Sequence, residues 1–197
     1  AERAARAGAD VIHVARPGYG RACLAGAAAA ADCDLLIFMD GDGADDPADL
    51  ASLMRPILRG EADLVIGSRT LGRTEIGALT LPQRWGNALA TSLMHVFWNG
   101  PFTDLGPFRA IRRSAYQRLA MQAPTFGWTV EMQVRALKQH LRCTEVPVAY
   151  RRRIGVSKIS GTVKGVVLAG AYILGTIFRE TLWPATQSVK RHNAVRR

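Results

Sequence analysis

The sequence predicts an α/β fold, an open sheet with flanking helices, and three observations point to it. Short apolar runs alternate with helix-like segments along the chain, as in folds whose strands are joined by helices. One run is continuously apolar, as expected of a strand covered on both faces. An acidic, glycine-rich turn follows that run, and ligands of open α/β sheets bind at the carboxyl ends of strands. At 197 residues the chain can bury the core of one domain.

The N-terminal segment predicts a helix, a strand, a second helix and a second strand in turn. Residues 1–7 are rich in Ala, Arg and Glu and predict a helix that ends at Gly8. Residues 10–15 predict a strand, and the alanine-rich residues 22–31 predict the next helix. The apolar run 35–39 predicts a strand buried in a parallel sheet.

The middle of the chain continues this alternation. Asp46 followed by Pro47 predicts an N-cap and a first-turn proline for a helix that runs to about Arg59. The next segments are a strand, a loop rich in Gly and Thr, and a helix with apolar positions on one side: 63–67, 68–82 and 83–98.

Three further elements are expected in the C-terminal half. They are a short strand, a helix and a late strand: 108–111, 128–140 and 144–150. Val130, Val134 and Leu137 lie roughly on one face of the predicted helix. Pro147 places the last strand at a sheet edge, because proline cannot donate to a ladder. No internal repeat or low-complexity linker interrupts the sequence, so we expect no second independent domain.

Composition excludes several classes of protein. The three cysteines, Cys23, Cys33 and Cys143, are widely spaced and form no Cys or Cys/His cluster that could hold zinc, so they indicate core residues of a reduced cytosolic protein. No zinc finger, RNP-like aromatic pattern or basic helix interleaved with aromatic residues is present, which argues against a nucleic-acid partner.

The net charge of +10 is concentrated at the C-terminal end. From residue 150 onward there are ten basic residues and one acidic residue, Glu180, so this segment carries +9 of the total. A basic tail on a nearly neutral body indicates an anionic partner surface. The uncharged stretch 165–178 is too short to span a bilayer, and we expect an amphipathic helix at a membrane surface.

The most informative local pattern is Asp40-Gly41-Asp42 at the end of the apolar run. Two carboxylates beside glycines that let a ligand approach the backbone suit a hard divalent cation that bridges phosphates. We therefore expect Asp40 and Asp42 to hold Mg²⁺ or Mn²⁺, with Asp45 close by. The alternative is a solvated turn, because turns are rich in Asp and Gly.

Several motifs in order give a resemblance to a known family. They are GYGRA, MDGDG with DDP, GSR, QRWGN, TDLGPFRAI and EVPVAYRRRIGVSK: 18–22, 39–47, 67–69, 83–87, 103–111 and 145–158. Together they resemble family 2 glycosyltransferases of the dolichol-phosphate mannosyltransferase (polyprenyl-phosphate glycosyltransferase) type. The resemblance implies a GT-A fold, a nucleotide-sugar donor and a polyprenyl-phosphate or other lipid-linked acceptor. It divides the chain into a partial catalytic domain, 1–160, and a basic amphipathic membrane-associated tail, 161–197.

The resemblance also assigns residues to the site. It places Asp40 and Asp42 at the metal and the donor diphosphate, and Arg69 and Arg84 near phosphate groups. Other residues are expected beside the donor or the acceptor: Gly18, Gly20, Asn87, Arg109, Arg153 and Lys158.

Two features depart from the family. Its members begin with two nucleotide-binding strands that this sequence does not show, so we interpret the chain as an N-terminally truncated form, with the first strands missing. The string LGPFRA stands where the mannosyltransferases have Ser-Gly-Phe-Arg-Ala, which bears on the choice of acceptor and sugar.

The same residues also allow plainer roles. Arg69 could bind phosphate bidentately or form a surface salt bridge. Arg84 and Asn87 share one helical face and could be ordinary surface residues. Arg153 belongs to a basic run that could meet lipid head groups or only solvent. For catalysis we expect Asp42, Arg69 and Arg84 to act, with Asp104 or Glu131 as a general base; the alternatives are a loop cap and a helix-surface acid.

We expect an enzyme that transfers a sugar with inversion of the anomeric carbon, in cell-envelope glycan synthesis. It would be cytoplasmic and bound peripherally to the inner face of the membrane, and it could form a homo-oligomer. A lipid phosphate needs no general base, because its second pKa is near 6, whereas a sugar hydroxyl needs one. The rival hypotheses are a non-catalytic membrane-binding relic of the fold and a sugar-phosphate nucleotidyltransferase.

Overall fold

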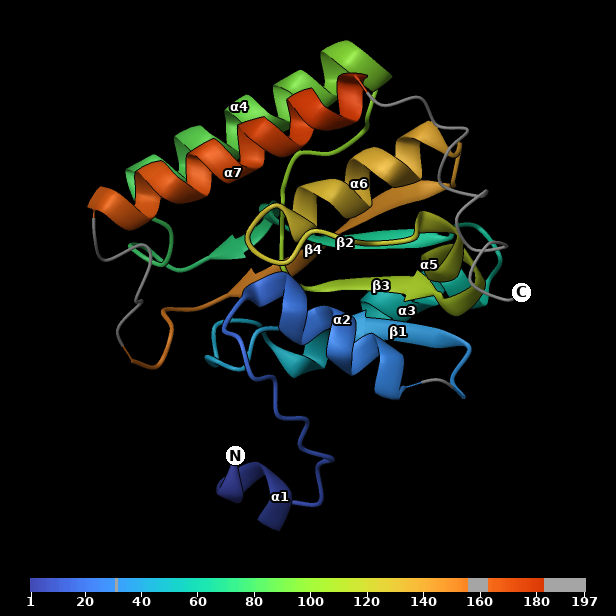
Figure 1. Cartoon of the computed structure of the whole chain (residues 1–197), viewed down its shortest axis with the longest axis vertical. Coiled ribbons are helices and arrows are strands. Elements are labelled where there is room, and N and C mark those ends of the chain that lie inside the picture. The colour runs from blue at the N-terminus through green and yellow to red at the C-terminus, as the bar shows by residue number, and fades with distance from the viewer. Residues whose placement is uncertain (31, 156–162, 183–197) are drawn as a thin grey trace.

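A computed structural model describes residues 1–30, 32–155 and 163–182 of the chain. It contains one mixed sheet in which the strand order is β1-β3-β2-β4 (Figure 1). The strands are β1 (Leu35–Phe38), β2 (Leu64–Thr74), β3 (Arg109–Arg112) and β4 (Cys143–Tyr150). Strand β3 runs antiparallel to both of its neighbours, whereas β2 and β4 are parallel.

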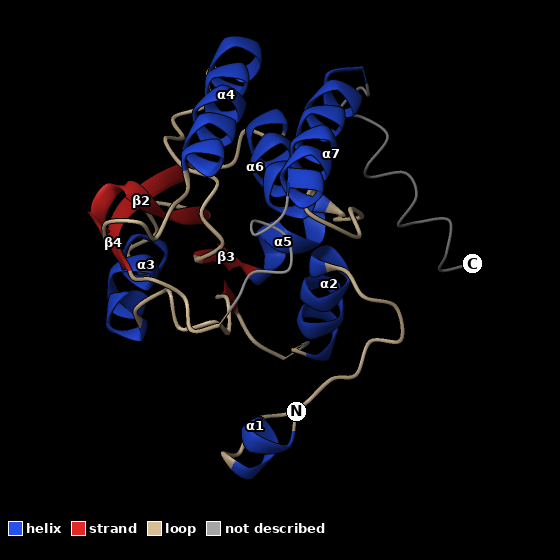
Figure 2. Cartoon of the chain, turned by 90° about the vertical axis from the view of Figure 1, so that its left-hand side faces the viewer, coloured by secondary structure: helices blue, strands red, loops and turns tan. Residues whose placement is uncertain are grey.

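Helices cover both faces of this open sheet. One face carries α2 (Tyr19–Ala29), α4 (Leu81–Trp98), α5 (Arg113–Leu119), α6 (Trp128–Lys138) and α7 (Val163–Leu182). The other face carries α3 (Leu50–Leu58), which follows the 3-10 turn Pro47–Asp49. In two views α4 and α7 lie together in the layer farthest from the sheet, and α1 (Glu2–Arg6) stands apart from the rest (Figures 1 and 2).

The two faces of the sheet build two apolar clusters because side chains alternate along a strand. Leu64 and Ile66 of β2 face the larger cluster under α2, α4, α5, α6 and α7. Val65, between them, faces the smaller cluster with Leu53 and Ile57 of α3. The predicted open α/β architecture is therefore confirmed.

Most predicted elements are present close to their expected bounds. The helix stop at Gly8, where φ is +84°, and the Asp46 cap, which accepts a hydrogen bond from the Ala48 amide, are both confirmed. Helix α4 begins with a capping box in which Thr80 and Gln83 satisfy each other's backbone amides. Proline-containing β4 lies at one end of the sheet, as expected of an edge strand.

Three predictions about the strands are wrong. Residues 10–15 form no strand, because no strand in the described sheet pairs with them, and the side chain of Ile12 stays exposed. β1 is not a buried parallel strand but lies at a sheet end, paired antiparallel with β3. The expected loop 68–82 begins late, because β2 continues to Thr74 by pairing with β4 beyond an irregularity.

Helix α7 is the described part of the predicted tail, and it packs on α4 and α6. Ile177 of this helix is fully buried in the larger cluster, so α7 belongs to the packed body of the molecule. Across the described ranges, every helix is too short or too polar to serve as a membrane-spanning segment.

Candidate functional site

The acidic turn after β1 forms the first part of the site. Asp40 and Asp42 are half-buried, and Asp45 is almost fully buried. Asp42 Oδ1 accepts the Ala44 amide at 3.0 Å, and Asp45 Oδ2 accepts the Asp40 amide at 3.4 Å. These local bonds fold the turn so that three carboxylates lie within a short stretch of backbone.

The turn is electrostatically strained because its carboxylates are close together and partly shielded from water. Burial is the main cause that raises the pKa of Asp40, and repulsion from the neighbouring Asp42 raises it further. A hydrogen bond from Tyr19 acts in the opposite direction. Burial raises the pKa of Asp45 to about 6, and its Oδ1 has no hydrogen-bond partner among the described residues. Such a turn gains from a bound cation.

We expect the Asp45→Asn variant to gain stability over the wild type as pH rises. The folded chain, with its raised Asp45 pKa, binds this proton more tightly than the unfolded chain does. Ionisation of Asp45 therefore destabilises the fold between about pH 4 and pH 6, by about 3 kcal/mol in total. Urea unfolding of both proteins in EDTA at pH 4, 5, 6 and 7 measures the difference. A difference that does not change with pH would contradict this account.

A segment after β4 lies against the acidic turn. Arg153 Nη1 is 3.4 Å from Asp42 Oδ2, and the Ile154 amide donates to the Asp42 carbonyl at 2.7 Å. Arg151 forms an ion pair with Asp46, and its amide donates to the Ala44 carbonyl. Arg153, expected beside the donor or the acceptor, has a carboxylate of the acidic turn as its partner.

Arg69 and Asp104 form the second part of the site. Arg69 follows the buried part of β2, and its Nε and Nη2 donate to Asp104 at 2.8 and 2.7 Å. The Arg69 guanidinium also lies over the Tyr150 ring, 5.0 Å from its centroid. Burial alone would lower the pKa of Arg69, but the hydrogen bonds to Asp104 raise it, so Arg69 stays protonated at neutral pH.

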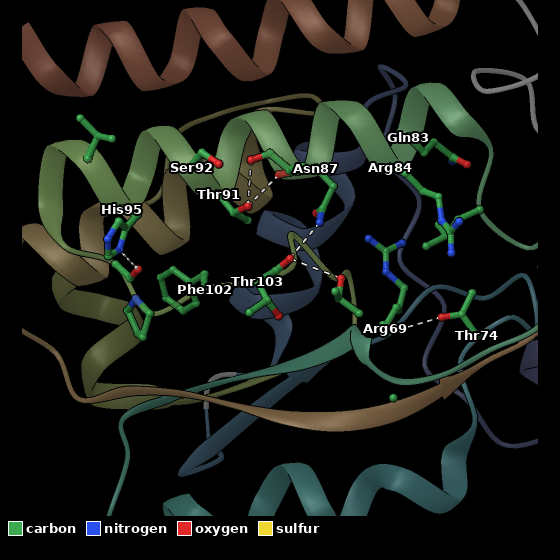
Figure 3. Close-up of a pocket in the computed structure, with 17 residues that line it drawn as sticks. Arg69, Thr74, Gln83, Arg84, Asn87, Thr91, Ser92, His95, Phe102 and Thr103 are labelled. Atoms are coloured by element: carbon green, nitrogen blue, oxygen red, sulfur yellow. Dashed lines mark hydrogen bonds between the residues drawn. The ribbon is translucent and has the colours of Figure 1, made fainter.

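A cleft of about 1000 Å³ lies between α4, β2 and the loop that contains Thr103. Arg69 and Arg84 reach toward each other from opposite walls of this cleft (Figure 3). Arg84 is exposed and, among the described residues, has no ion-pair partner. The cleft therefore presents guanidinium groups to an anionic ligand.

The loop 102–106 forms the floor of this cleft and is held by residues of α4 and β4. Asn87 of α4 donates to the Thr103 carbonyl at 2.9 Å and accepts the Leu105 amide at 2.8 Å. Glu145 of β4 accepts the amides of Thr103 and Asp104. Asn87 was expected at the ligand, but both of its amide atoms are engaged in positioning this loop.

Arg109 lies below the site, which differs from the predicted contact with donor or acceptor. It is fully buried, donates to the carbonyls of Leu105, Gly106 and Thr129, and lies over the Trp128 ring. Burial lowers its pKa to about 10, which still leaves it protonated at neutral pH. Arg109 therefore holds the loop 102–106 from beneath, and its guanidinium is engaged by backbone carbonyls.

Gly18 and Gly20, predicted to bind donor or acceptor, are required for packing instead. A Cβ on Gly18 would overlap the Pro124 carbonyl oxygen, and one on Gly20 would overlap that of Ala123. The Arg21 amide donates to Pro124 at 3.1 Å, so the start of α2 rests on the backbone of this loop. This contact sets the position of Tyr19, whose hydroxyl lies beside Asp40.

We expect Gly20→Ala to destabilise the fold by about 1 to 3 kcal/mol, because the added methyl group overlaps backbone that cannot move aside easily. Gly26→Ala is the matched control: it lies in the same helix, and its Cβ would meet nothing within 4 Å. This control should be stabilising by up to about 1 kcal/mol. Urea unfolding measures both, and equal effects of the two substitutions would contradict the packing argument.

Glu131, one of the two predicted bases, is buried in a network of charges. Its Oε2 accepts the amides of Gln122 and Ala123 at 3.0 and 2.7 Å. Its Oε1 pairs with Arg135 at 2.9 Å and Arg179 at 3.3 Å. Glu131 therefore positions the loop under α2, and both of its carboxylate oxygens are engaged within the protein. Asp104, the other predicted base, is likewise fully engaged by Arg69, and Lys158 lies outside the described residues.

Tyr19, Glu145 and Tyr150 are site residues that the sequence did not reveal. Tyr19 lies beside Asp40, Glu145 holds the cleft loop, and Tyr150 supports Arg69. Glu145 and Tyr150 belong to a recognised motif, but only the pairing of β4 with β2 shows that they meet residues of distant segments.

The residues of the acidic turn fit a divalent cation. All the available donors are carboxylate oxygens, which Mg²⁺ and Mn²⁺ prefer, and a buried Asp45 oxygen next to them lacks a partner. Within the described ranges, no three His, Cys, Asp or Glu side chains are grouped so that they could hold a metal ion. Further ligands would have to come from water or substrate.

The open mixed sheet and its flanking helices define a GT-A type of domain. A solved structure of glucosyl-3-phosphoglycerate synthase from Mycobacterium tuberculosis superposes with a TM-score of 0.68 and 20% identity, and the match covers 93% of this chain and 64% of that one. At this identity the likeness shows the fold.

The chain belongs to glycosyl transferase family 2, whose model matches residues 1–120. An uncharacterized glycosyltransferase of Mycobacterium tuberculosis is 35% identical over 169 residues, which cover 84% of this chain and 75% of that protein. The undecaprenyl-phosphate mannosyltransferase of Micrococcus luteus is 31% identical over 147 residues, which cover 67% of this chain and 56% of that protein.

Proposed function

We propose that the chain is the catalytic part of a glycosyltransferase that moves a sugar from a nucleotide-sugar donor to a polyprenyl phosphate. The observation that carries this proposal is the meeting of two charged regions. The acidic turn at the end of β1 lies near Arg69, whose charge acts on both Asp40 and Asp45, and Arg69 also faces the cleft opposite Arg84. One region suits a metal-bound diphosphate, and the other suits a second phosphate.

The donor side is assigned to the acidic turn. Asp40 and Asp42 would hold Mg²⁺ or Mn²⁺, which would offset the negative charge of the departing nucleoside diphosphate. The fold neighbours support a divalent cation, because the Mycobacterium tuberculosis synthase was solved with Mn²⁺ and UDP-glucose.

The acceptor side is assigned to the cleft, and the engagement of both candidate bases in ion pairs favours a phosphate there. A hydroxyl acceptor needs a carboxylate to take its proton, but Asp104 and Glu131 are both held in buried ion pairs. A phosphate monoester is already anionic near neutral pH and attacks without a base. Arg84, and the exposed edge of the Arg69 guanidinium, would orient it opposite the leaving group, and a direct displacement of this kind inverts the anomeric carbon.

Two relatives that act on polyprenyl compounds support a lipid-linked acceptor. One is the Micrococcus luteus enzyme above, and the other is the polyprenol monophosphomannose synthase of Mycolicibacterium smegmatis, which is 29% identical over 177 residues. We propose that the protein works on cell-envelope glycans as a peripheral protein at the inner face of the membrane, where its basic C-terminal segment would meet anionic lipid.

The test is transfer of labelled sugar into lipid. The chain is incubated with Mn²⁺, a panel of labelled nucleotide sugars and either a polyprenyl phosphate or the matching polyprenol, and label in the organic phase is counted. Label should enter the phosphate and not the alcohol. Transfer to the alcohol, or to a soluble sugar hydroxyl, would overturn the phosphate acceptor, and metal-dependent nucleotide binding without transfer to any acceptor would support a non-catalytic relic.

A further inference from the structure

Helix α4 carries an apolar stripe on its outer surface. Leu81, Trp85, Leu89 and Val96 are 70, 76, 50 and 73% exposed, although large apolar residues are rarely exposed in a row. Their spacing places them on one side of the helix. We define these four residues as the α4 stripe.

The core does not account for the stripe. Helix α4 already buries a different side, through Ala90, Thr91 and Met94. The neighbouring helix α7 packs on α4 in the same outer layer (Figures 1 and 2). It carries further exposed apolar side chains, Leu168, Phe178 and Leu182. Exposed apolar side chains gathered on two helices that pack on each other indicate an interaction surface, whereas singly scattered ones do not.

We propose that the α4 stripe, with the adjoining face of α7, is the surface that docks on an anionic membrane. Charge selects this occupant. Helix α4 contains Arg84 and no acidic residue, and +9 of the net charge of +10 lies from residue 150 onward, in the part of the chain that includes α7. A second copy would bring two strongly basic chains together, whereas an anionic bilayer attracts both the charge and the apolar side chains. Trp85 suits the boundary between head groups and acyl chains.

Docking in this way places the cleft beside the lipid. Arg84, Ala88 and Ser92 line the cleft, and each lies within one helical turn of Trp85 or Leu89 on α4. Val96 of the stripe also lines the cleft, in which Arg84 and Ser92 are seen in Figure 3. A phosphate bound at Arg84 would stay close to the head-group level, while its hydrocarbon chain remains in the bilayer. The proposal thus explains how the proposed function could act on a lipid that does not leave the membrane, but its test does not depend on catalysis.

The experiment measures binding of the full chain to vesicles made of equal parts phosphatidylglycerol and phosphatidylcholine, without donor. The double variant Trp85→Ser, Leu89→Ser should bind at least ~10-fold more weakly, because it removes two large apolar contacts with the bilayer. Leu58→Ser is the control: Leu58 is 71% exposed but lies on α3, across the sheet. Its binding should match that of the wild type.

Fluorescence separates docking through α4 from docking through the basic C-terminal segment alone. Tryptophan emission should shift to the blue on vesicle binding and be quenched by brominated lipid. Trp85→Phe should still bind while it loses this quenched component. Unchanged binding of the double variant, or no quenching of Trp85, would overturn the proposal.

If a second copy of the chain bound the α4 stripe in place of a membrane, the measurements would differ. Sedimentation velocity would then give a dimer that the double variant dissociates, with vesicle binding unchanged. That result would also overturn membrane docking through α4. The double variant should still transfer sugar to an acceptor dispersed in detergent, because that reaction needs no docking on a membrane. Loss of transfer in detergent by the wild type would instead count against the proposed function.

Discussion

The Asp42→Asn variant should lose Mn²⁺-dependent binding of nucleoside diphosphates by at least ~100-fold, because one of only two assigned carboxylate ligands becomes a neutral amide. The change also removes the ion-pair partner of Arg153 and leaves a basic side chain beside the turn. Calorimetric titration with a panel of nucleoside diphosphates, with and without Mn²⁺, measures the loss and identifies the preferred base.

Asp34→Asn is the matched control for this experiment. Asp34 lies just before β1, at the opposite end of the strand from the acidic turn, and it is exposed. The two substitutions change the net charge equally, so only a specific role of Asp42 would separate them. Binding that survives in Asp42→Asn, or that is equally strong in EDTA, would remove the metal from the donor site.

Replacing Asp104 by Asn should lower the free energy of unfolding by about 3 to 5 kcal/mol, because a buried Arg69 would lose its charge partner. Asp104 is 1% exposed and receives three hydrogen bonds from Arg69. The two roles considered for Asp104 give different results. If Asp104 is a general base, the substitution should lower kcat and leave the free energy of unfolding nearly unchanged. If Asp104 positions Arg69, the substitution should lower the free energy of unfolding.

Urea unfolding at pH 7 measures this effect, with Glu75→Gln as control. Glu75 pairs with Arg152, but both side chains are more than half exposed. Loss of that pair should cost less than about 1 kcal/mol. In the double variant Arg69→Met, Asp104→Asn, much of the lost stability should return, since no unpaired charge remains buried. Native stability of Asp104→Asn with abolished turnover would instead restore Asp104 as a base.

The sequence predicted the helices and strands that have strong local signals. The Asp46-Pro47 cap, the helix after Thr80 and the short strand before Arg113 were recognisable because capping residues and apolar periodicity act within a few residues. The strand expected at 10–15 failed because a strand exists only when another strand pairs with it, which no local pattern can guarantee.

The candidate site divides in the same way. The acidic turn could be predicted because its residues are adjacent and follow one strand. Arg69 and Asp104 were recognised separately, but their pairing depends on how β2 meets a loop far along the chain. Arg109 shows why a motif residue need not touch a ligand: its guanidinium satisfies buried carbonyls instead.

The pairing of β2 with β4 has a consequence for how the molecule assembles. Glu145, on the last strand, is the residue that accepts the amides of Thr103 and Asp104, and Asp104 in turn holds Arg69. Strands β2 and β4 are far apart in the sequence, and closing so long a loop costs entropy, which slows folding. Glu145 can hold the loop that positions Asp104 and Arg69 only once β4 has paired with β2, so the binding properties of the chain would depend on completion of this sheet.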